Sequence, residues 1–339
     1  MRLERFHQIT SSYPRLRIAI AGDFCLDRYF EIDPARAEVS IETGLEVYNV
    51  MRVRCQPGGA GTILNNLAAL GVGQIFPIGF YGDDGEGFEL RRSLAARRGV
   101  DLRHFISSSA LNTFTYSKPL VLEAGRSPRE LNRLDLKNWK PTDQNVAQQL
   151  AKAIRSVAEQ VDALIVLDQV DIPETGVITR IVREALGEIA AAHPSLLILA
   201  DSRRGLGDFP KLGYKMNAQE LARMRKMGGA LSKTEVQALA KDLSQETGKA
   251  VFITMAEQGI IGASPGEMPI HRPALPVRGE IDIVGAGDSV TANLTAALAA
   301  RGTIAEACEL AMLASSVVIH QLGTTGTASV AQMEEFLES

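Results

Sequence analysis

The sequence predicts an α/β protein with a doubly wound, mostly parallel sheet flanked by helices and a small β-sheet lid, and three observations support this fold class. The first is that short apolar runs alternate with stretches of helical periodicity. Continuous apolarity over about five residues is typical of a strand buried on both faces, as in a parallel sheet covered by helices. The runs span residues 17–21, 75–79, 163–167, 196–200, 214–216 and 251–254.

The second observation is that polar residues follow four of these runs. They are Asp23, Asp168, Asp201 and Asn217. Each has a structural explanation, because Asp and Asn also cap helices after strand-to-helix turns. Four together favour a ligand site at the carboxyl ends of the strands, where open α/β sheets bind their ligands.

The third observation is that two segments, 41–53 and 114–122, alternate between apolar and polar residues. This alternation predicts strands of a half-exposed small sheet. Both segments lie between elements of the main sheet, so we expect one domain over residues 1–339 with a discontinuous β lid from about 26–54 and 112–136. The bare face of such a lid could cover a substrate or a second subunit, and we expect a homodimer formed through it.

Composition excludes several classes of protein. The formal net charge of -4 and the aromatic content of 5% do not indicate a surface that binds nucleic acid. The three cysteines lack metal-ligand spacing and fit a reducing compartment. No apolar run approaches the roughly 18 to 20 residues of a membrane helix, and residues 1–17 are too polar for a signal peptide. We therefore expect a cytoplasmic protein that binds neither nucleic acid nor a membrane.

Residues 282–291 carry the strongest chemical signal. Gly285, Ala286 and Gly287 precede a helical apolar pattern, so their backbone N–H groups could converge on an anion at the positive end of the helix dipole. Asp288 lies in the same turn, where an anion site would avoid a carboxylate unless a proton acceptor were needed. The pattern predicts phosphoryl transfer, with Asp288 as general base and the three amides as anion hole.

A second glycine loop, residues 57–61, precedes another helical pattern. Its glycines could let a polyhydroxylated ligand lie against the backbone. Taken alone, the loop is better explained as a simple tight turn, and the ligand interpretation gains weight from the loop at residues 285–288. Neither this loop nor residues 71–73 has the glycine spacing of a dinucleotide-binding fingerprint, and the chain has no P-loop.

Together the two glycine loops resemble those of the ribokinase-like (PfkB) family of carbohydrate kinases, and the resemblance runs from about residue 15 to residue 330. Residues 217–220 resemble the family's Asn-x-x-Glu element, residues 254–259 a turn beside the nucleotide, and residues 323–324 a segment on the adenine side. The resemblance implies ATP and Mg²⁺ as cofactors, with K⁺ as an optional addition.

The resemblance also implies roles for individual residues. The acceptor would be held by Asp23, Asp27, Gly58, Gly59 and Asn66. The nucleotide would contact Asn217, Glu220, Thr254, Glu257, Gly259 and Gly323, with Glu220 and Asn217 placing Mg²⁺ through water. Asp282 would shape its loop or help to hold a monovalent cation.

Within the family, residues 22–29, 39–42 and 321–324 are similar to those of bacterial kinases of heptose 7-phosphate. Thr62 and Arg203 depart from that group on the sugar side, so a hexose phosphate, a free sugar or a nucleoside stays open as acceptor. Lys118 and Arg133 could meet a phosphate on the substrate or be solvated lid charges.

Two other functions compete with a kinase. A kinase-like protein could bind a sugar or nucleotide as a sensor without turnover. A nicotinamide-dependent oxidoreductase is disfavoured by the missing fingerprint.

Overall fold

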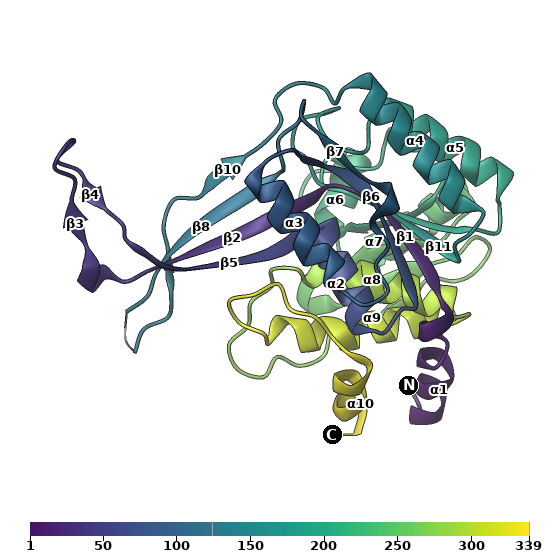
Figure 1. Ribbon diagram of the computed structural model, residues 1–339. Helices are drawn as coiled ribbons and strands as arrows, with labels where there is room; N and C mark the ends of the chain where they lie inside the picture. The colour runs from purple at the N-terminus through teal and green to yellow at the C-terminus, as the bar shows by residue number, and fades with distance from the viewer. Residues whose placement is uncertain (124, 339) are drawn as a thin grey trace.

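The large sheet of this computed structural model contains nine strands within the described residues, which are 1–123 and 125–338 (Figure 1). Seven adjacent strands run parallel to one another, and antiparallel pairing adds two more strands at one edge. In spatial order they are β7 (Phe105–Ser108), β6 (Gln74–Gly82), β1 (Arg17–Gly22), β11 (Ala163–Asp168), β12 (Leu197–Ser202), β13 (Gly213–Asn217), β14 (Val251–Thr254), β15 (Ile260–Ala263) and β16 (Ile270–Arg272).

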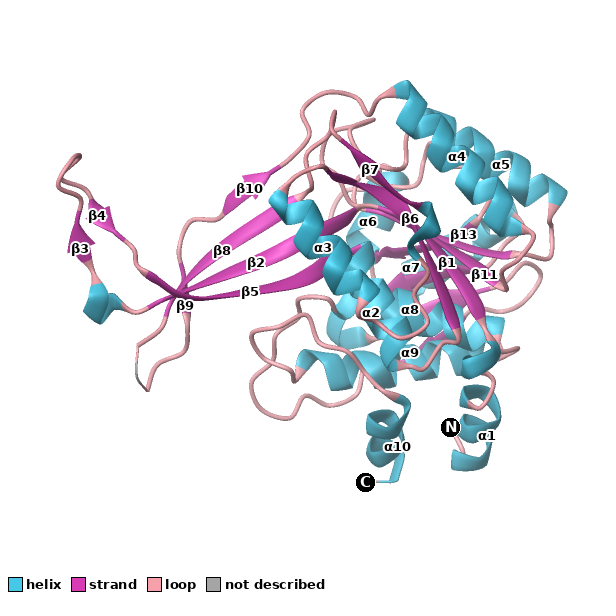
Figure 2. Ribbon diagram, viewed as in Figure 1, coloured by secondary structure: helices cyan, strands magenta, loops and turns pink. Residues whose placement is uncertain are grey.

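Helices cover both faces of this sheet (Figure 2). One apolar cluster joins the sheet to α1 (Leu3–Thr10), α2 (Ala60–Ala69), α3 (Gly85–Ala95), α8 (Ala286–Ala299), α9 (Ile304–Ile319) and α10 (Val330–Glu338). The other cluster joins it to α4 (Gln144–Ala158), α5 (Arg180–Ala192), α6 (Ala218–Met224) and α7 (Lys233–Thr247). Within β1, Ile18 belongs to the first cluster and Ala19 to the second, as the alternation of a strand requires.

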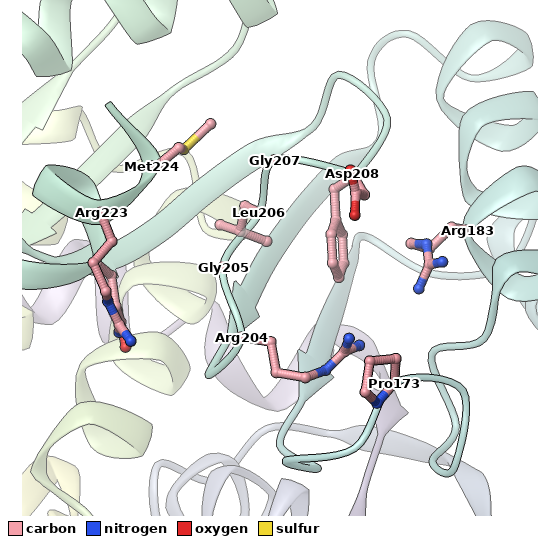
Figure 3. A pocket seen from close by; sticks show the side chains of 11 residues that line it. Pro173, Arg183, Arg204, Gly205, Leu206, Gly207, Asp208, Arg223 and Met224 are labelled. Carbon is pink, nitrogen blue, oxygen red and sulfur yellow. The ribbon is translucent and has the colours of Figure 1, made fainter. Parts of the chain in front are cut away.

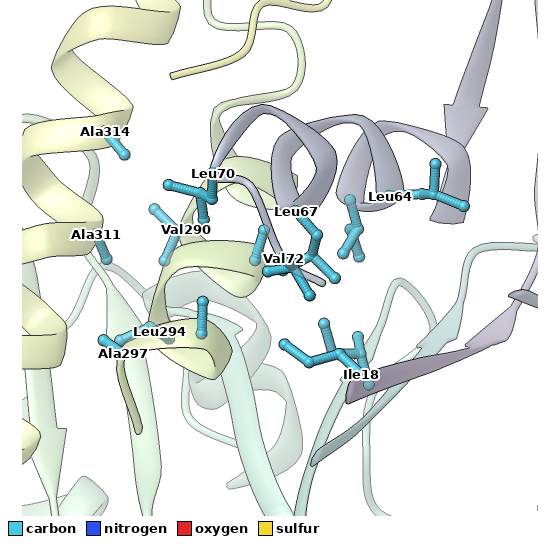
Figure 4. Packing of buried hydrophobic residues seen from close by; sticks show 14 of the residues in the cluster. Ile18, Leu64, Leu67, Leu70, Val72, Val290, Leu294, Ala297, Ala311 and Ala314 are labelled. Atoms are coloured by element: carbon cyan, nitrogen blue, oxygen red, sulfur yellow. The ribbon is translucent and has the colours of Figure 1, made fainter. Parts of the chain in front are cut away.

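The first cluster fixes the start of α8, which matters for the candidate site. Val290 and Leu294 of α8 pack between α2 and α9, against Leu67 and Ala311 among others (Figure 4). Both side chains are almost fully buried. Since close-packed interiors resist displacement, α8 begins at a fixed place relative to the sheet edge.

A second, smaller sheet projects from the body of the molecule (Figure 1). Its strands are β10 (Leu134–Leu136), β8 (Thr115–Val121), β2 (Phe24–Ile32) and β5 (Val50–Gly59), and β9 (Arg129–Glu130) pairs with β8. The pairing of β2 with β8 is parallel and the others are antiparallel. Because β2 follows β1 after one residue, this sheet grows directly out of the carboxyl edge of the large sheet.

The predicted fold class is confirmed, but the alternating segment 41–53 is only partly strand. Two short strands, β3 (Glu38–Val39) and β4 (Glu46–Val47), form a ribbon at the tip, and residues 41–45 turn between them. The turn is closed by hydrogen bonds between Ser40 and Leu45 and between Gly44 and Ser40, with Gly44 at φ +67°. The strand prediction was wrong there because the alternation continues through a turn where no second layer buries the apolar residues.

No helix in the described parts of the chain is long and apolar enough to cross a bilayer.

Candidate active site

The four polar residues predicted to lie together do so. Asp23 follows β1, Asp168 ends β11, Asp201 lies near the end of β12 and Asn217 ends β13. These strands are neighbours in the sheet and run parallel, so their carboxyl ends share one edge. The small sheet and the start of α8 adjoin the same edge. This is the crevice in which open α/β sheets bind their ligands.

The start of α8 has free N–H groups. Gly285 caps the helix at φ +82°, a conformation that favours glycine. The N–H groups of Gly285, Gly287 and Asp288 donate no hydrogen bond to any described residue. The Ala286 N–H instead donates to the Ile283 carbonyl at 3.2 Å, within the turn that leads into the helix. The Ala286 amide, predicted to join the anion hole, is therefore not free, whereas the Asp288 amide is.

Asp288 is half-buried in the first turn of α8. Burial raises the pKa of its carboxyl to about 7, while Lys215 acts in the opposite direction, and the negative charges of Asp201 and Asp27 raise the pKa further. A carboxyl with this pKa exchanges a proton readily near neutral pH, as a general base must.

Asp282 shapes the loop before α8. One carboxylate oxygen accepts the Val284 N–H at 3.0 Å, and the other accepts the Gly323 N–H at 3.3 Å. Asp282 therefore joins the loop of residues 282–285 to the segment around Gly323, which has φ +69°. Of the two predicted roles, these bonds support loop shaping.

Asp23 lies inside the protein instead of facing the crevice. One carboxylate oxygen accepts the N–H groups of Gln169 and Val170 at 2.7 and 3.2 Å, and the other accepts that of Val177 at 2.7 Å. Burial and the neighbouring Asp168 raise the pKa of Asp23 to about 7. The predicted sugar contact is not supported, because both oxygens hold the loop after β11.

The predicted contact between Asn66 and a sugar is not supported either. Its side chain is 0% exposed, and its amide nitrogen donates to the carbonyls of Thr62 and Gly326 at 3.0 and 3.4 Å. A fully buried amide in α2 cannot touch a sugar in the crevice. Asn66 holds the segment around Gly326 against α2.

Asp27, Gly58 and Gly59 form the base of the small sheet. Asp27 is buried beside Lys118, with 3.2 Å between Oδ1 and Nζ. A Cβ on Gly58 would lie 2.7 Å from Asp27 Oδ2, and one on Gly59 would lie 2.5 Å from the Asp23 carbonyl oxygen. Gly59 has φ +56°, so both glycines are required for the close approach of β5 and β2, whatever ligand they meet.

Asn217 and Glu220 form a reciprocal cap at the start of α6. Asn217 Oδ1 accepts the Glu220 N–H at 2.9 Å, and Glu220 Oε2 accepts the Asn217 N–H at 2.8 Å. Burial raises the pKa of Glu220. In the described residues, no three His, Cys, Asp or Glu side chains gather to hold a metal ion, so a metal here would need ligands from a bound phosphate or from water.

Three of the predicted nucleotide residues lie beyond Asn217 along the same edge. Thr254 ends β14 and pairs with Asn217 across the strands, and Glu257 is exposed in the turn that follows. Gly259 is buried at φ +92°, and its N–H and carbonyl groups both bond within that turn. Gly259 therefore shapes the turn and offers no free backbone group to a nucleotide, which corrects its predicted role.

Lys215 was missed by the sequence analysis. It lies on β13, 7% exposed, with Nζ 2.7 Å from Asp201 Oδ2. The available signal was a lysine inside the apolar run 214–216, where a cation needs a partner.

A pocket of about 360 Å³ opens beside Glu220, between α5, α6 and the loop after β12 (Figure 3). Arg183, Arg204 and Arg223 line it. Arg204 is paired with Asp168 at 2.8 Å and Arg183 with Glu174 at 2.9 Å, so much of this positive charge is already compensated.

A second pocket of about 250 Å³ lies at the inner side of the small sheet and is lined by Tyr116, Lys137, Trp139 and Asp171 among others. Its charged groups belong to a chain of ion pairs in which cations and carboxylates alternate. The members are Arg133, Asp135, Lys137, Asp171 and Arg203, with separations of 2.7 to 3.9 Å. The chain links the small sheet to the loops at the edge of the large one.

The fold and this edge define a class, an α/β protein with a helix start whose amides are free beside an ionisable carboxyl group. Solved structures of about the same size share the fold. Arabidopsis thaliana ribokinase complexed with ribose and ATP matches with a TM-score of 0.69 and 17% identity, covering 96% of this chain and 99% of that one. Escherichia coli phosphofructokinase-2 in complex with fructose-6-phosphate matches with a TM-score of 0.68 and 18% identity, covering 96% and 100%.

Sequence comparisons show which proteins the chain is similar to. Residues 214–331 match the family described as pfkB family carbohydrate kinase. The bifunctional protein HldE of Azotobacter vinelandii is 31% identical over 96% of this chain and 64% of its own length, and that of Pectobacterium atrosepticum is 30% identical over 91% and 60%. The chain thus spans less than two thirds of the length of these relatives. Residues 214–331 thus form a region similar to the pfkB family of carbohydrate kinases.

Proposed function

We propose that the chain catalyses ATP-dependent phosphorylation of a hydroxyl group on a sugar or sugar phosphate. The observation that carries this proposal is the start of α8, where free amides and the Asp288 carboxyl, with its pKa of about 7, lie in one turn. Amides bind charge, and a carboxylate accepts a proton, so together they serve both partners of a phosphoryl transfer.

In the proposed reaction, Asp288 accepts the proton of the acceptor hydroxyl while the oxygen of that hydroxyl forms a bond to the γ-phosphorus. The bond between the γ-phosphorus and the β–γ bridging oxygen breaks, and that oxygen leaves with the electron pair on ADP. The N–H groups of Gly285, Gly287 and Asp288 bind charge on the transferred group. The proton on Asp288 is then released to solvent.

Magnesium fits this site through phosphate and water. Glu220 uses one carboxylate oxygen in the α6 cap, which leaves the other for a water molecule of the hydrated metal. When bound, the ion would neutralise triphosphate charge. A monovalent cation such as K⁺ is an optional addition, to be tested beside Asp282.

For the acceptor, we propose a sugar phosphate of the heptose 7-phosphate type, held at the base of the small sheet by Asp27 and the nearby pocket. Lys118 lies on β8 and Arg133 just before the edge strand β10, each beside a carboxylate. A substrate phosphate could take the place of those carboxylates as their partner. The small sheet would close over the acceptor and exclude water.

The Asp288→Asn variant tests the reaction. It should lose about 10²- to 10⁴-fold in kcat, because the amide cannot accept the proton, and should still bind ATP. Release of ADP from a panel of sugars and sugar phosphates, with Mg²⁺ and with or without K⁺, measures turnover, and calorimetry measures ATP binding. A sensor that binds without turnover predicts no ADP release by the wild type. Wild-type turnover by Asp288→Asn would exclude Asp288 as the base.

A further inference from the structure

Lys215 is an unusual residue in the edge described above. It is a lysine on a central strand, between Tyr214 and Met216, whose side chains are both buried in the apolar core. Lysine is almost never fully buried unless it is paired. A pair that served stability alone could be replaced by apolar side chains with little loss. Pairing alone therefore does not explain why a lysine occupies this position.

The ammonium of Lys215 lies at the mouth of α8. A Cβ placed on Gly287 would be 3.3 Å from Nζ, so the cation adjoins one of the free amides of the helix start. An ammonium has three N–H donors, and the 2.7 Å contact with Asp201 uses one of them. The others are available to a ligand that binds at those amides.

Asp201 holds this ammonium in place and is itself tied to α8. The Thr291 hydroxyl lies 3.4 Å from Asp201 Oδ2 and 3.1 Å from the Gly287 carbonyl oxygen, so its one proton is shared between these two acceptors. The carboxylate therefore links β13 to the first turn of α8. Such a link fixes the distance between the cation and the amides.

The charges around Lys215 are mostly negative. Although burial disfavours its charged form, the carboxylates of Asp201, Asp288 and Glu220 outweigh burial and raise the pKa of Lys215. Lys215 therefore stays protonated near neutral pH. The positive charge of Lys215 offsets the repulsion between these three carboxylates and a phosphate, so a phosphate can approach this edge.

We propose that Lys215 is a catalytic residue that donates to the γ-phosphoryl group of the nucleotide, with Asp201 as the residue that positions it. This inference rests on the proposed kinase function and adds a side-chain cation to the amides of α8. The cation compensates charge on the transferred group and keeps neighbouring Asp288 ionised to act as the base.

Nucleotide binding provides a test that needs no turnover. With Mg²⁺ present, Lys215→Met should weaken ATP binding by about tenfold and leave ADP binding within about twofold, because the contact is with the γ-phosphoryl group. Calorimetric titration with each nucleotide measures both. Equal losses for ATP and ADP, or no loss for either, would overturn the proposal.

The double variant Lys215→Met/Asp201→Asn is the matched control. It removes both charges of the pair and leaves no buried carboxylate without its partner, so it should unfold at a higher temperature than Lys215→Met alone. We expect kcat to be lower by about 10²-fold in both variants, with a smaller change in KM. Recovery of wild-type kcat in the double variant would mean that the pair is structural and would refute the catalytic role.

The two proposals can fail separately. A wild type that releases no ADP with any acceptor, yet shows the difference between ATP and ADP on Lys215→Met substitution, contradicts the kinase reaction and supports the phosphate contact. A wild type that turns over while Lys215→Met does so equally well contradicts the role of Lys215 alone.

Discussion

At the scale of single residues, the titration of Asp288 gives the first prediction. Its pKa is raised from 3.8 to about 7, so the carboxyl is protonated below this pH and cannot accept the proton of the acceptor. We expect kcat/KM to be full above about pH 8 and to fall as the pH decreases through about 7. Measurement from pH 5.5 to 9 tests this, and an activity that persists unchanged to pH 5.5 would contradict it. In Lys215→Met the fall should begin at a higher pH, because the cation that favours the ionised form is gone.

Asp23 gives a prediction about stability. Its two oxygens accept three backbone N–H groups, and an amide in its place would point an NH₂ group at one or more of those donors. Asp23→Asn should therefore lower the free energy of unfolding by about 1–3 kcal/mol. Urea denaturation measures the loss. Asp33→Asn is the control, because half-buried Asp33 accepts one backbone N–H, that of Ala35, and pairs with exposed Arg36, so this variant should lose less.

The same residues show where sequence reasoning stops. The apolar runs predicted the central strands because burial on both faces leaves a pattern in the chain itself. The position of Asp23 at a strand end was predicted for the same reason. Which atoms bond to it depends on a loop 146 to 154 residues away, and the burial of Asn66 depends on Gly326, 260 residues away. No local pattern encodes such contacts.

At the scale of elements, the start of α8 depends on Gly285. A side chain there would strain a backbone at φ +82° and would lie 3.3 Å from side-chain atoms of Thr325 and Thr62. We expect Gly285→Ala to displace the amides from the positions that bind phosphate, with a loss of about 10²-fold in kcat. Gly266→Ala is the matched control. Gly266 has a similar φ of +79° with open space around it, so this variant should keep its activity. Equal activities of the two variants would contradict the proposed importance of this turn.

At the scale of the whole molecule, the small sheet and the site are parts of one chain path. β2 continues from β1 after Asp23, β5 leads into α2 through Gly59, and α2 packs on α8. The ion pairs from Arg133 to Arg203 add a link on the other side of the crevice. A movement of the small sheet would therefore be transmitted to both the acceptor pocket and the start of α8.

The tip of the small sheet supports the last prediction, that two copies associate through it. Val39 and Leu45 are 65% and 69% exposed, and Ile41 is fully exposed between them. Clustered apolar side chains on one projecting ribbon are typical of an interface. In a dimer with twofold symmetry, each ribbon would cover the other copy's small sheet. We expect the wild type to sediment as a dimer and Ile41→Glu/Leu45→Glu to sediment as a monomer, because burying the carboxylates would cost more than the contact returns. Met268→Glu changes an exposed apolar residue far along the chain, at 78% exposure, and should remain dimeric. A wild type that sediments as a monomer at micromolar concentration, or a ribbon variant that stays dimeric, would exclude this interface.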